Sequence, residues 1–184
     1  MNFKLIFPTY RTRFNEVTHF FKSHKKFDSL LNVGCGEGEF DPLLRRHTNK
    51  MYGCDINKND IIHCEQANKK LKIHYSVQDA RSLKYKQSSF DGIVCMEVLE
   101  YLGNYQLAIK EMSRVLHKNG TAVITIPNKN FPFTYDPINY VLSFFGKHIS
   151  FGAYAYGHEA LIDEQDIESF FKKNGFSIVK KKRL

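Results

Sequence analysis

The sequence of 184 residues lacks the features of several large protein classes. No apolar run approaches the roughly 18 residues of a membrane-spanning helix, which excludes a spanning segment. Residues 1–8 are too short and too quickly polar for a signal peptide, so we expect a cytoplasmic protein. No repeat or low-complexity segment interrupts the chain, and no linker is needed. We therefore expect one domain over residues 1–184.

The four cysteines lack the spacing of a metal site or a redox motif. Cys35, Cys54, Cys64 and Cys95 form no CxxC pair and have no ligand-like spacing to a histidine. Three of them lie in apolar runs or turns. We expect reduced packing residues and no metal ligand among them.

The net charge of +8 is concentrated near the two ends of the chain. The cations involved are Arg11, Arg13, Lys22, Lys25 and Lys26 before the first strand, and Lys180, Lys181, Lys182 and Arg183 at the end. Neither cluster is interleaved with aromatic residues as in nucleic-acid-binding motifs. The pattern indicates a solvated face or attraction to anionic partners, and we expect no nucleic-acid partner.

A glycine-rich stretch organises the chain. Residues 30–40 read LLNVGCGEGEF, an apolar run that breaks into Gly34, Gly36 and Gly38 and then becomes polar. Glycines allow a ligand to approach the main chain without a Cβ in the way. The stretch therefore predicts a strand that ends in a ligand cradle, although plain strand-to-helix punctuation is the alternative.

Strand and helix patterns alternate along the whole chain. Strands are expected up to Val33 and over residues 50–54, 71–77, 90–97, 121–126 and 176–179; helices over residues 10–24, from Asp41-Pro42, after Asn57 or Asn59, over 104–117 with Gly120 beyond the end, and after Asp163. This alternation predicts an α/β, Rossmann-like, open and mostly parallel twisted sheet with helices on both faces, ending at the sixth strand.

The ends of the expected strands suggest which ligand the cradle holds. Asp55 lies 21 residues after Gly34, which suits a carboxylate that accepts hydrogen bonds from a ribose diol. Dinucleotide enzymes and nucleoside-binding transferases share this feature. A dinucleotide fingerprint needs glycine or alanine at position 39, but the chain has Glu39 there. Glu37 and Glu39 would repel a pyrophosphate, so a ligand with a cationic amino group fits better.

These motifs together resemble the class I S-adenosylmethionine-dependent methyltransferases, with similarity to the quinone and lipid methyltransferase-like group. The resemblance rests on residues 31–38, Asp55, Asp79-Ala80, residues 90–101 and residues 118–127. It implies S-adenosylmethionine as cofactor. Its expected contacts are Gly34, Gly36 and Gly38 with the methionine part, Asp55 with the ribose, Ile56 with the adenine, Asp79 and Ala80 with the adenine edge, and Met96 and Glu97 near the sulfonium.

The chain departs from the family pattern at several positions. Asn32 occupies a position that is usually acidic; it keeps hydrogen-bonding capacity but contributes no charge, and we include it among the cofactor contacts. Glu100-Tyr101 replaces the Glu-His of the closest relatives. The Asn-Pro-Pro-Tyr motif of nucleic-acid amino methylators is absent. The family normally closes with an antiparallel sixth and seventh strand, whereas this chain stops at Leu184, so we expect either a shortened member or a removed C-terminus.

An aromatic-rich segment separates the fifth strand from the last helix. Residues 128–162 contain 9 of the 26 aromatic residues of the chain. So many rings predict a lid, an apolar substrate pocket or a membrane-surface patch, and a helical subdomain with its own small core is the alternative. Rings and cations alternate near residue 145, so we expect peripheral membrane contact through residues 131–156.

Methyl transfer to an oxygen requires removal of a proton from the acceptor. The bases considered are His158, His148 and Glu100, with Tyr101 or Tyr156 as orienting hydroxyls. His158 is preferred because its unperturbed pKa lies near neutrality, and a structural loop histidine is the alternative. We take His158, Glu100 and Tyr101 as the catalytic candidates.

The predicted function is methyl transfer from S-adenosylmethionine to an oxygen or carbon of a small aromatic or lipid-like acceptor. The alternatives are an NAD(P)-dependent oxidoreductase and an inert S-adenosylmethionine-binding module. A sheet edge left by the incomplete final strand pair also predicts a homodimer in which a second copy covers that edge.

Overall fold

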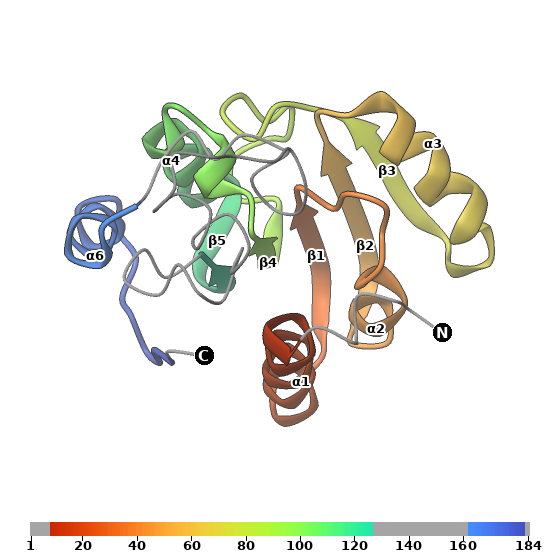
Figure 1. Ribbon diagram of the computed structural model, residues 1–184, viewed down its shortest axis with the longest axis horizontal. Helices are drawn as coiled ribbons and strands as arrows, with labels where there is room; N and C mark the ends of the chain where they lie inside the picture. The colour runs from red at the N-terminus through yellow and green to blue at the C-terminus, as the bar shows by residue number, and fades with distance from the viewer. Residues whose placement is uncertain (1–7, 127–161, 183–184) are drawn as a thin grey trace, which may run out of the picture.

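The computed structural model describes residues 8–126 and 162–182 (Figure 1). Within these residues, five strands form one sheet in the order β3-β2-β1-β4-β5, and every neighbouring pair is parallel. This order places the first strand, β1, at the centre of the sheet. The predicted open, parallel α/β architecture is confirmed.

The elements follow the expected alternation. The strands are β1 (Phe27–Val33), β2 (Thr48–Asp55), β3 (Ile73–Val77), β4 (Phe90–Met96) and β5 (Leu116–Thr125). The helices are α1 (Pro8–Ser23), α2 (Asp41–Arg45), α3 (Lys58–Ala67), α4 (Tyr105–Val115) and α6 (Glu164–Lys173), with short 3-10 turns at Lys69–Leu71 and Leu99–Tyr101.

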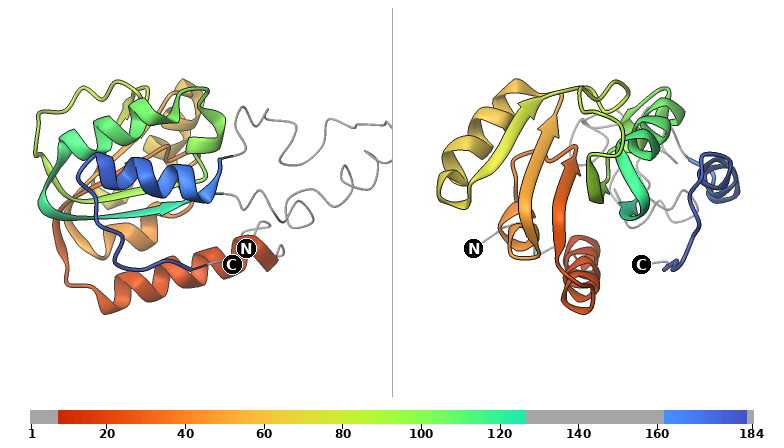
Figure 2. Two further views of the ribbon diagram at one scale, coloured as in Figure 1. Left: turned by 90° about the vertical axis from the view of Figure 1, so that its left-hand side faces the viewer. Right: turned by 180° about the vertical axis from the view of Figure 1, so that it is seen from behind.

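Helices cover both faces of the sheet (Figures 1 and 2). Helices α1 and α2 pack on one face, where Phe21 and Leu44 meet Leu30 and Val94. Helix α4 and Ile167 of α6 pack on the opposite face. Neighbouring residues on one strand alternate between the two faces, as the period of a strand requires.

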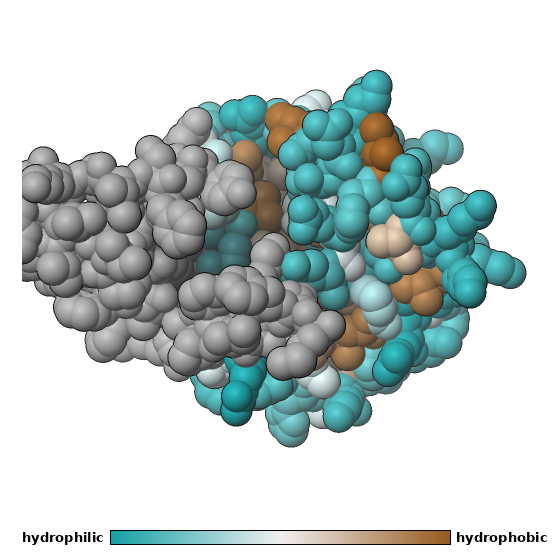
Figure 3. Space-filling view, turned by 45° about the vertical axis from the view of Figure 1, so that its right-hand side comes forward, coloured by the Kyte–Doolittle hydropathy of each residue, from teal (hydrophilic) through white to brown (hydrophobic). Residues whose placement is uncertain are grey.

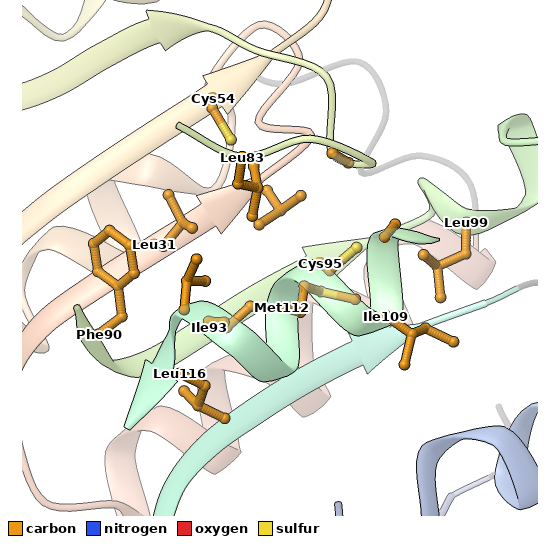
Figure 4. Packing of buried hydrophobic residues seen from close by; sticks show 14 of the residues in the cluster. Leu31, Cys54, Leu83, Phe90, Ile93, Cys95, Leu99, Ile109, Met112 and Leu116 are labelled. Carbon is orange, nitrogen blue, oxygen red and sulfur yellow. The ribbon is translucent and has the colours of Figure 1, made fainter. Parts of the chain in front are cut away.

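The larger core lies between α4 and the sheet (Figure 4). Met112 and Ile109 of α4 are fully buried against Ile93 and Leu31 of the central strands. Because β1 and β4 are apolar toward both faces, they form the buried centre of a parallel sheet. This core fixes the carboxyl ends of the strands relative to one another.

Side chains at the predicted helix starts form the expected caps. Of the two residues proposed to cap α3, Asn57 does so, and its side-chain oxygen accepts from Asn59 N at 3.0 Å. Asp163 caps α6 by accepting from Gln165 N at 2.8 Å. Each bond satisfies a backbone N–H that has no partner inside the helix.

The predicted boundary between the fourth helix and the fifth strand is wrong. Helix α4 ends at Val115, and β5 already begins at Leu116, whose side chain is buried. Leu116 pairs with Phe90, whereas the next strand pair is Gly92 with Thr121, so residues 117–120 form an irregularity in the strand. Asn119 has a φ of +67° within it. The polar run that resembles a helix end is therefore a bulge in β5.

The predicted sixth strand is also wrong, because residues 176–182 form no strand. Val179 is 92% exposed, and Phe176 packs on Phe171 of α6 with ring centroids 5.5 Å apart. The cations that follow find carboxylates outside the sheet: Lys181 Nζ lies 2.6 Å from Glu168 Oε1, and Lys182 Nζ lies 2.6 Å from Glu16 Oε1 of α1. The tail therefore runs from α6 toward α1 (Figure 2).

Within residues 8–126 and 162–182, no helix combines the length and apolar character needed to cross a bilayer. Figure 3 shows one face of the molecule, on which the described surface is mostly hydrophilic with separate apolar side chains.

Candidate functional site

A cleft of about 710 Å³ opens at the carboxyl ends of the strands. The turn after β1, the residues after β2 and β3, and the loop after β4 line it, and Arg13 of α1 closes one side. Parallel strands bring their carboxyl ends to the same edge, which explains why residues distant in sequence meet here. A smaller hollow of about 530 Å³ near Asp28 and Tyr52 contains none of the predicted site residues.

Most of the predicted site residues lie in this cleft. They are Asn32, Gly34, Gly36, Asp55, Ile56, Asp79, Ala80, Met96, Glu97 and Tyr101. Gly38 and Glu100 do not line it. Residues 128–161 of the aromatic-rich segment lie outside the described residues, and with them His148, Tyr156 and His158.

The glycine turn offers open main chain at one position. Gly36 has a φ of +52°, and a Cβ built there would meet nothing within 4 Å. A Cβ at Gly34 would instead overlap the side chain of Val98. Packing therefore requires glycine at position 34, whereas the space above Gly36 is free for a ligand that contacts the backbone. The turn after β1 therefore has the open main chain that a ligand cradle requires.

Asp55 is held in place by main-chain donors. Its Oδ2 accepts from Gly36 N at 2.9 Å, and its Oδ1 accepts from Asn57 N at 2.9 Å. These two bonds fix the carboxylate at the end of β2 beside the glycine turn. Each oxygen retains acceptor capacity, because a carboxylate offers about four lone-pair sites. The group is thus preorganised to accept hydroxyl donors such as those of a ribose.

Asp79 is engaged by Arg81, a residue that the sequence analysis did not identify. Arg81 Nη2 lies 2.8 Å from Asp79 Oδ2, and Arg81 N donates to Asp79 Oδ1 at 2.8 Å. The side-chain hydrogen bond from Arg81 lowers the pKa of Asp79. The carboxylate is therefore ionised at neutral pH and fixed in direction at the end of β3.

Glu97 stands at the turn after β4 in a strained conformation. Its φ is +54°, which is uncommon for a residue with a side chain. Arg13 Nη2 lies 3.1 Å from Glu97 Oε2, and Thr125 Oγ1 donates to Glu97 Oε1 at 2.9 Å. Burial raises the pKa of Glu97, while Arg13 and Thr125 oppose that shift. Strain of this kind is concentrated at functional sites.

Glu100 lies beneath the cleft and not in it. Its side chain is 1% exposed, and neither carboxyl oxygen has a hydrogen-bond partner in another described residue. Burial, followed by the nearby charge of Glu97, raises the pKa of Glu100 to about 8. Direct contact with a ligand in the cleft would require the side chain to move, so the geometry favours Glu97 over Glu100 as the carboxyl group on this side.

One group of described side chains could hold a metal ion. Cys35, Asp41 and Cys64 place their ligand atoms within 4.8 Å of one another under the glycine turn. Burial and the contact with Cys64 raise the pKa of Cys35 far above its ordinary value, with the Cys64 hydrogen bond as the larger cause. Cys64 Sγ donates to Gly36 O at 3.1 Å. All four cysteines are free and buried, as the sequence predicts.

The sequence analysis does not assign three residues at or near the cleft: Arg13 and Arg81 line it, and Asp41 lies beside Cys35 and Cys64. Arg13 reaches the cleft from α1, and no local pattern indicates this because the crossing of α1 under the sheet is a tertiary feature. In the sequence, Asp41 carries only the signal of a helix start. Arg81 did carry a signal, since it lies two residues after the strand-end Asp79.

Comparison with known proteins identifies the family of this chain. A family model described as a methyltransferase domain matches residues 31–124. A ubiquinone biosynthesis O-methyltransferase of Pelagibacter ubique is 31% identical over 158 residues, which cover 82% of this chain and 62% of that protein. A mitochondrial protein of the same description from Dictyostelium discoideum is 27% identical over 173 residues, covering 85% and 52%. The chain thus spans about half to three fifths of these relatives.

Solved structures show the same architecture. The N-methyltransferase NodS of Bradyrhizobium japonicum, solved with S-adenosyl-L-homocysteine, has a TM-score of 0.59 and 26% identity over 64% of this chain and 61% of its own. The YcgJ protein of Bacillus subtilis has a TM-score of 0.70 and 16% identity over 89% and 68% of the two chains. The second likeness is one of fold.

Proposed function

Because the chain belongs to the methyltransferase-domain family, with S-adenosylmethionine as its cofactor, we propose that it methylates a small aromatic, lipid-like acceptor. The proposed nucleophile is an oxygen, and a carbon of the same acceptor is the second candidate. The similarity to ubiquinone biosynthesis O-methyltransferases over 82% of the chain supports an oxygen of an aromatic compound.

The cleft at the carboxyl edge carries this proposal. Gly36 would present open main chain to the methionine part of the cofactor, and Gly34 and Gly38 would shape the turn around it. Asp55 would accept the ribose hydroxyls, with Ile56 against the adenine. Asp79 and Ala80 would meet the adenine edge. When bound, S-adenosylmethionine supplies an electrophilic methyl group on a sulfonium, and the protein supplies proximity and orientation.

The acceptor would occupy the side of the cleft formed by Met96, Glu97 and Tyr101. A hydroxyl acceptor must lose its proton as the new carbon–oxygen bond forms. Two groups are proposed to take that proton: His158, outside the described residues, and the carboxylate of Glu97. The raised pKa of Glu97 makes it a stronger base than an ordinary carboxylate. Tyr101 would orient the hydroxyl.

Calorimetry and turnover test this function in sequence. We expect S-adenosylhomocysteine to bind and NAD not to bind; the opposite result would restore the oxidoreductase alternative. Turnover is then measured by mass spectrometry on catechol-type acceptors with and without an apolar tail, beside amine acceptors. Binding without turnover on any acceptor would leave an inert cofactor-binding module.

The base is tested by two substitutions on the best acceptor. If Glu97 takes the proton, Glu97→Gln lowers turnover roughly 100-fold or more, whereas His158→Ala leaves it intact. If His158 takes it, the pattern is reversed. Equal turnover in both variants and the wild type would mean that the acceptor ionises without either group.

A further inference from the structure

A buried polar cluster lies directly under the glycine turn. Asp41, at the start of α2, is 0% exposed, and both of its carboxyl oxygens accept hydrogen bonds. Tyr75 OH of β3 donates to Asp41 Oδ2 at 2.6 Å, and Asn32 Nδ2 of β1 donates to Asp41 Oδ1 at 2.8 Å. Asn68 Nδ2 donates to Tyr75 OH at 3.0 Å. Side chains of β1 and β3 thus meet at one carboxylate of α2.

The cluster leaves one acceptor unused. Asn32 is 2% exposed and lines the cleft, and its Oδ1 has no hydrogen-bond partner among the residues that the structure describes. The bond to Asp41 fixes the orientation of the amide, because it commits Nδ2 to the carboxylate. A buried acceptor without a partner costs free energy, so a ligand donor at this position would recover that cost.

Two glycines make room for the cluster. A Cβ at Gly38 would lie 2.9 Å from Asp41 Oδ2 and 2.8 Å from Asn68 Nδ2. A Cβ at Gly53 of β2 would lie 2.7 Å from the ring of Tyr75. Any other residue at either position would displace the groups that hold Asp41. The third glycine of the turn therefore serves this carboxylate as well as the turn itself.

The charge of Asp41 lacks a counter-ion in the described structure. Both of its partners are neutral donors, and no cation of residues 8–126 or 162–182 forms an ion pair with it. Burial raises the pKa of Asp41, while the hydrogen bonds from Tyr75 and Asn32 oppose that shift. Arg13, which also lines the cleft, is paired with Glu97. A buried carboxylate in this state is stabilised by a cation that binds nearby.

We propose that Asp41 is a positioning residue for the α-ammonium group of the cofactor: it orients Asn32 so that Asn32 Oδ1 accepts from the ammonium, and it supplies the negative charge. The inference rests on the proposed cofactor. Position 32 is usually acidic in the family but is Asn32 here, and we assign the negative charge of that position to Asp41. Asn32 makes the contact, and Asp41 acts through it.

The binding of two ligands distinguishes this role of Asp41 from a general contribution to folding. S-adenosylhomocysteine has the ammonium group, whereas methylthioadenosine has the adenosine and sulfur but lacks the amino-acid part. Asp41→Asn removes the negative charge and leaves one accepting oxygen, so the new amide cannot accept from both Tyr75 OH and Asn32 Nδ2 as the carboxylate does, and Asn32 loses its fixed orientation. We expect calorimetry to give roughly 10- to 100-fold weaker binding of S-adenosylhomocysteine and methylthioadenosine binding within about twofold of wild type.

A charge exchange provides the decisive control. The double variant Asn32→Asp/Asp41→Asn restores one carboxylate and one amide with their places exchanged, and it is expected to recover S-adenosylhomocysteine affinity to within about threefold of wild type. Tyr75→Phe, which removes only one donor to Asp41, is expected to weaken S-adenosylhomocysteine alone. It also keeps the proposal testable if Asp41→Asn fails to fold.

The outcomes are distinct for the two proposals. Equal weakening of both ligands by Asp41→Asn or Tyr75→Phe, unchanged binding of S-adenosylhomocysteine, or no recovery in the double variant would overturn the role of Asp41 alone. If the wild-type chain binds neither ligand, the proposed function fails and this inference fails with it.

Discussion

At the scale of single residues, the two glutamates after β4 are held in opposite ways. Glu97 has a cation and a hydroxyl as partners, whereas Glu100, three residues later, is buried without a partner in another described residue. Burial and the charge of Glu97 raise the pKa of Glu100 to about 8. Glu100 therefore carries its proton at neutral pH in the native protein and releases it on unfolding.

This raised pKa predicts how stability changes with pH. Between the ordinary glutamate value of 4.5 and about 8, the native state binds one proton more than the unfolded state. The free energy of unfolding therefore falls as pH rises, by up to about 1.4 kcal/mol per pH unit from this group. Glu100→Gln removes that loss, so urea unfolding should show a more stable variant at pH 8 and little change at pH 4.

Glu111→Gln is the control of opposite sign. The hydrogen bond from Arg114 lowers the pKa of Glu111, so its contribution is present above the ordinary value and is lost as pH falls. This variant should be less stable than wild type at neutral pH. An identical pH slope in wild type and Glu100→Gln would contradict the assigned state of Glu100.

The open main chain at Gly36 gives a prediction for ligand binding. Gly36→Ala places a methyl group in the space proposed for the cofactor, and positive φ adds roughly 1–2 kcal/mol of strain. We expect S-adenosylhomocysteine affinity to fall by roughly tenfold or more in calorimetry. The matched variant is Gly175→Ala, where φ is +86° and a Cβ also meets nothing within 4 Å, but outside the cleft. Equal affinity of Gly36→Ala and Gly175→Ala for S-adenosylhomocysteine would refute the cradle.

At the scale of elements, α4 connects the core to the side of the cleft that Tyr101 lines. Its buried stripe packs on the central strands (Figure 4). Leu107, on the same helix, is 41% exposed. Helix α4 begins at Tyr105, shortly after the 3-10 turn Leu99–Tyr101, and Tyr101 lines the cleft. Packing of α4 therefore positions a residue of the site.

Substitutions on the two sides of α4 should differ in cost. Met112 is 0% exposed, and Met112→Ala should lower the free energy of unfolding by about 2–5 kcal/mol, because it leaves a cavity against the sheet. Leu107→Ala, on the exposed side, should change it by less than about 1 kcal/mol. Urea unfolding of both variants measures the difference. A similar loss of unfolding free energy in both variants would contradict the buried and exposed sides assigned to α4.

The elements also show what the sequence can predict. Parallel strands bring their ends to one edge, so the strand pattern predicts Asp55 at the cleft, and the family resemblance adds Asp79 and Glu97, which line the same cleft. Partners that depend on tertiary packing could not be predicted in this way. Tyr75 contacts Asp41 across 34 positions of sequence. Arg13 lies on α1, before the first strand, and pairs with Glu97 after the fourth strand of the chain.

The same limit explains the predicted sixth strand. An alternating apolar pattern at residues 176–179 is compatible with a strand or with an extended tail, and the difference lies in where its side chains find partners. Here Phe176 returns to α6, and Lys181 and Lys182 find carboxylates on α6 and α1. The hydropathy of residues 176–179 does not distinguish a strand from an extended tail, because the difference depends on these tertiary contacts.

At the scale of the whole molecule, the cleft draws residues from almost every part of the sheet. The loops after β1, β2, β3 and β4 meet there, and α1 contributes Arg13 to the cleft and Phe21 to the core. A ligand in the cleft is therefore bound only while these elements are assembled. Binding should stabilise the described sheet as a unit and not one loop.

Thermal unfolding checks this coupling. S-adenosylhomocysteine at 100 times its dissociation constant should add about 2.7 kcal/mol to the free energy of unfolding. For a chain of this length, that corresponds to a rise in Tm of roughly 5–10 °C. NAD at the same concentration should leave Tm unchanged, because Glu39 and Glu37 oppose a pyrophosphate at the glycine turn.

Substitutions show whether that stabilisation passes through the proposed cradle. Gly36→Ala should show a much smaller rise with S-adenosylhomocysteine at the concentration used for wild type, whereas Gly175→Ala should show the full rise from a lower starting Tm. A full rise in Gly36→Ala would mean that the ligand binds away from the glycine turn. An equal rise with NAD would mean that the cleft recognises the shared adenosine alone, and the amino-acid end of the cofactor would then contribute nothing to the stability of the assembled sheet.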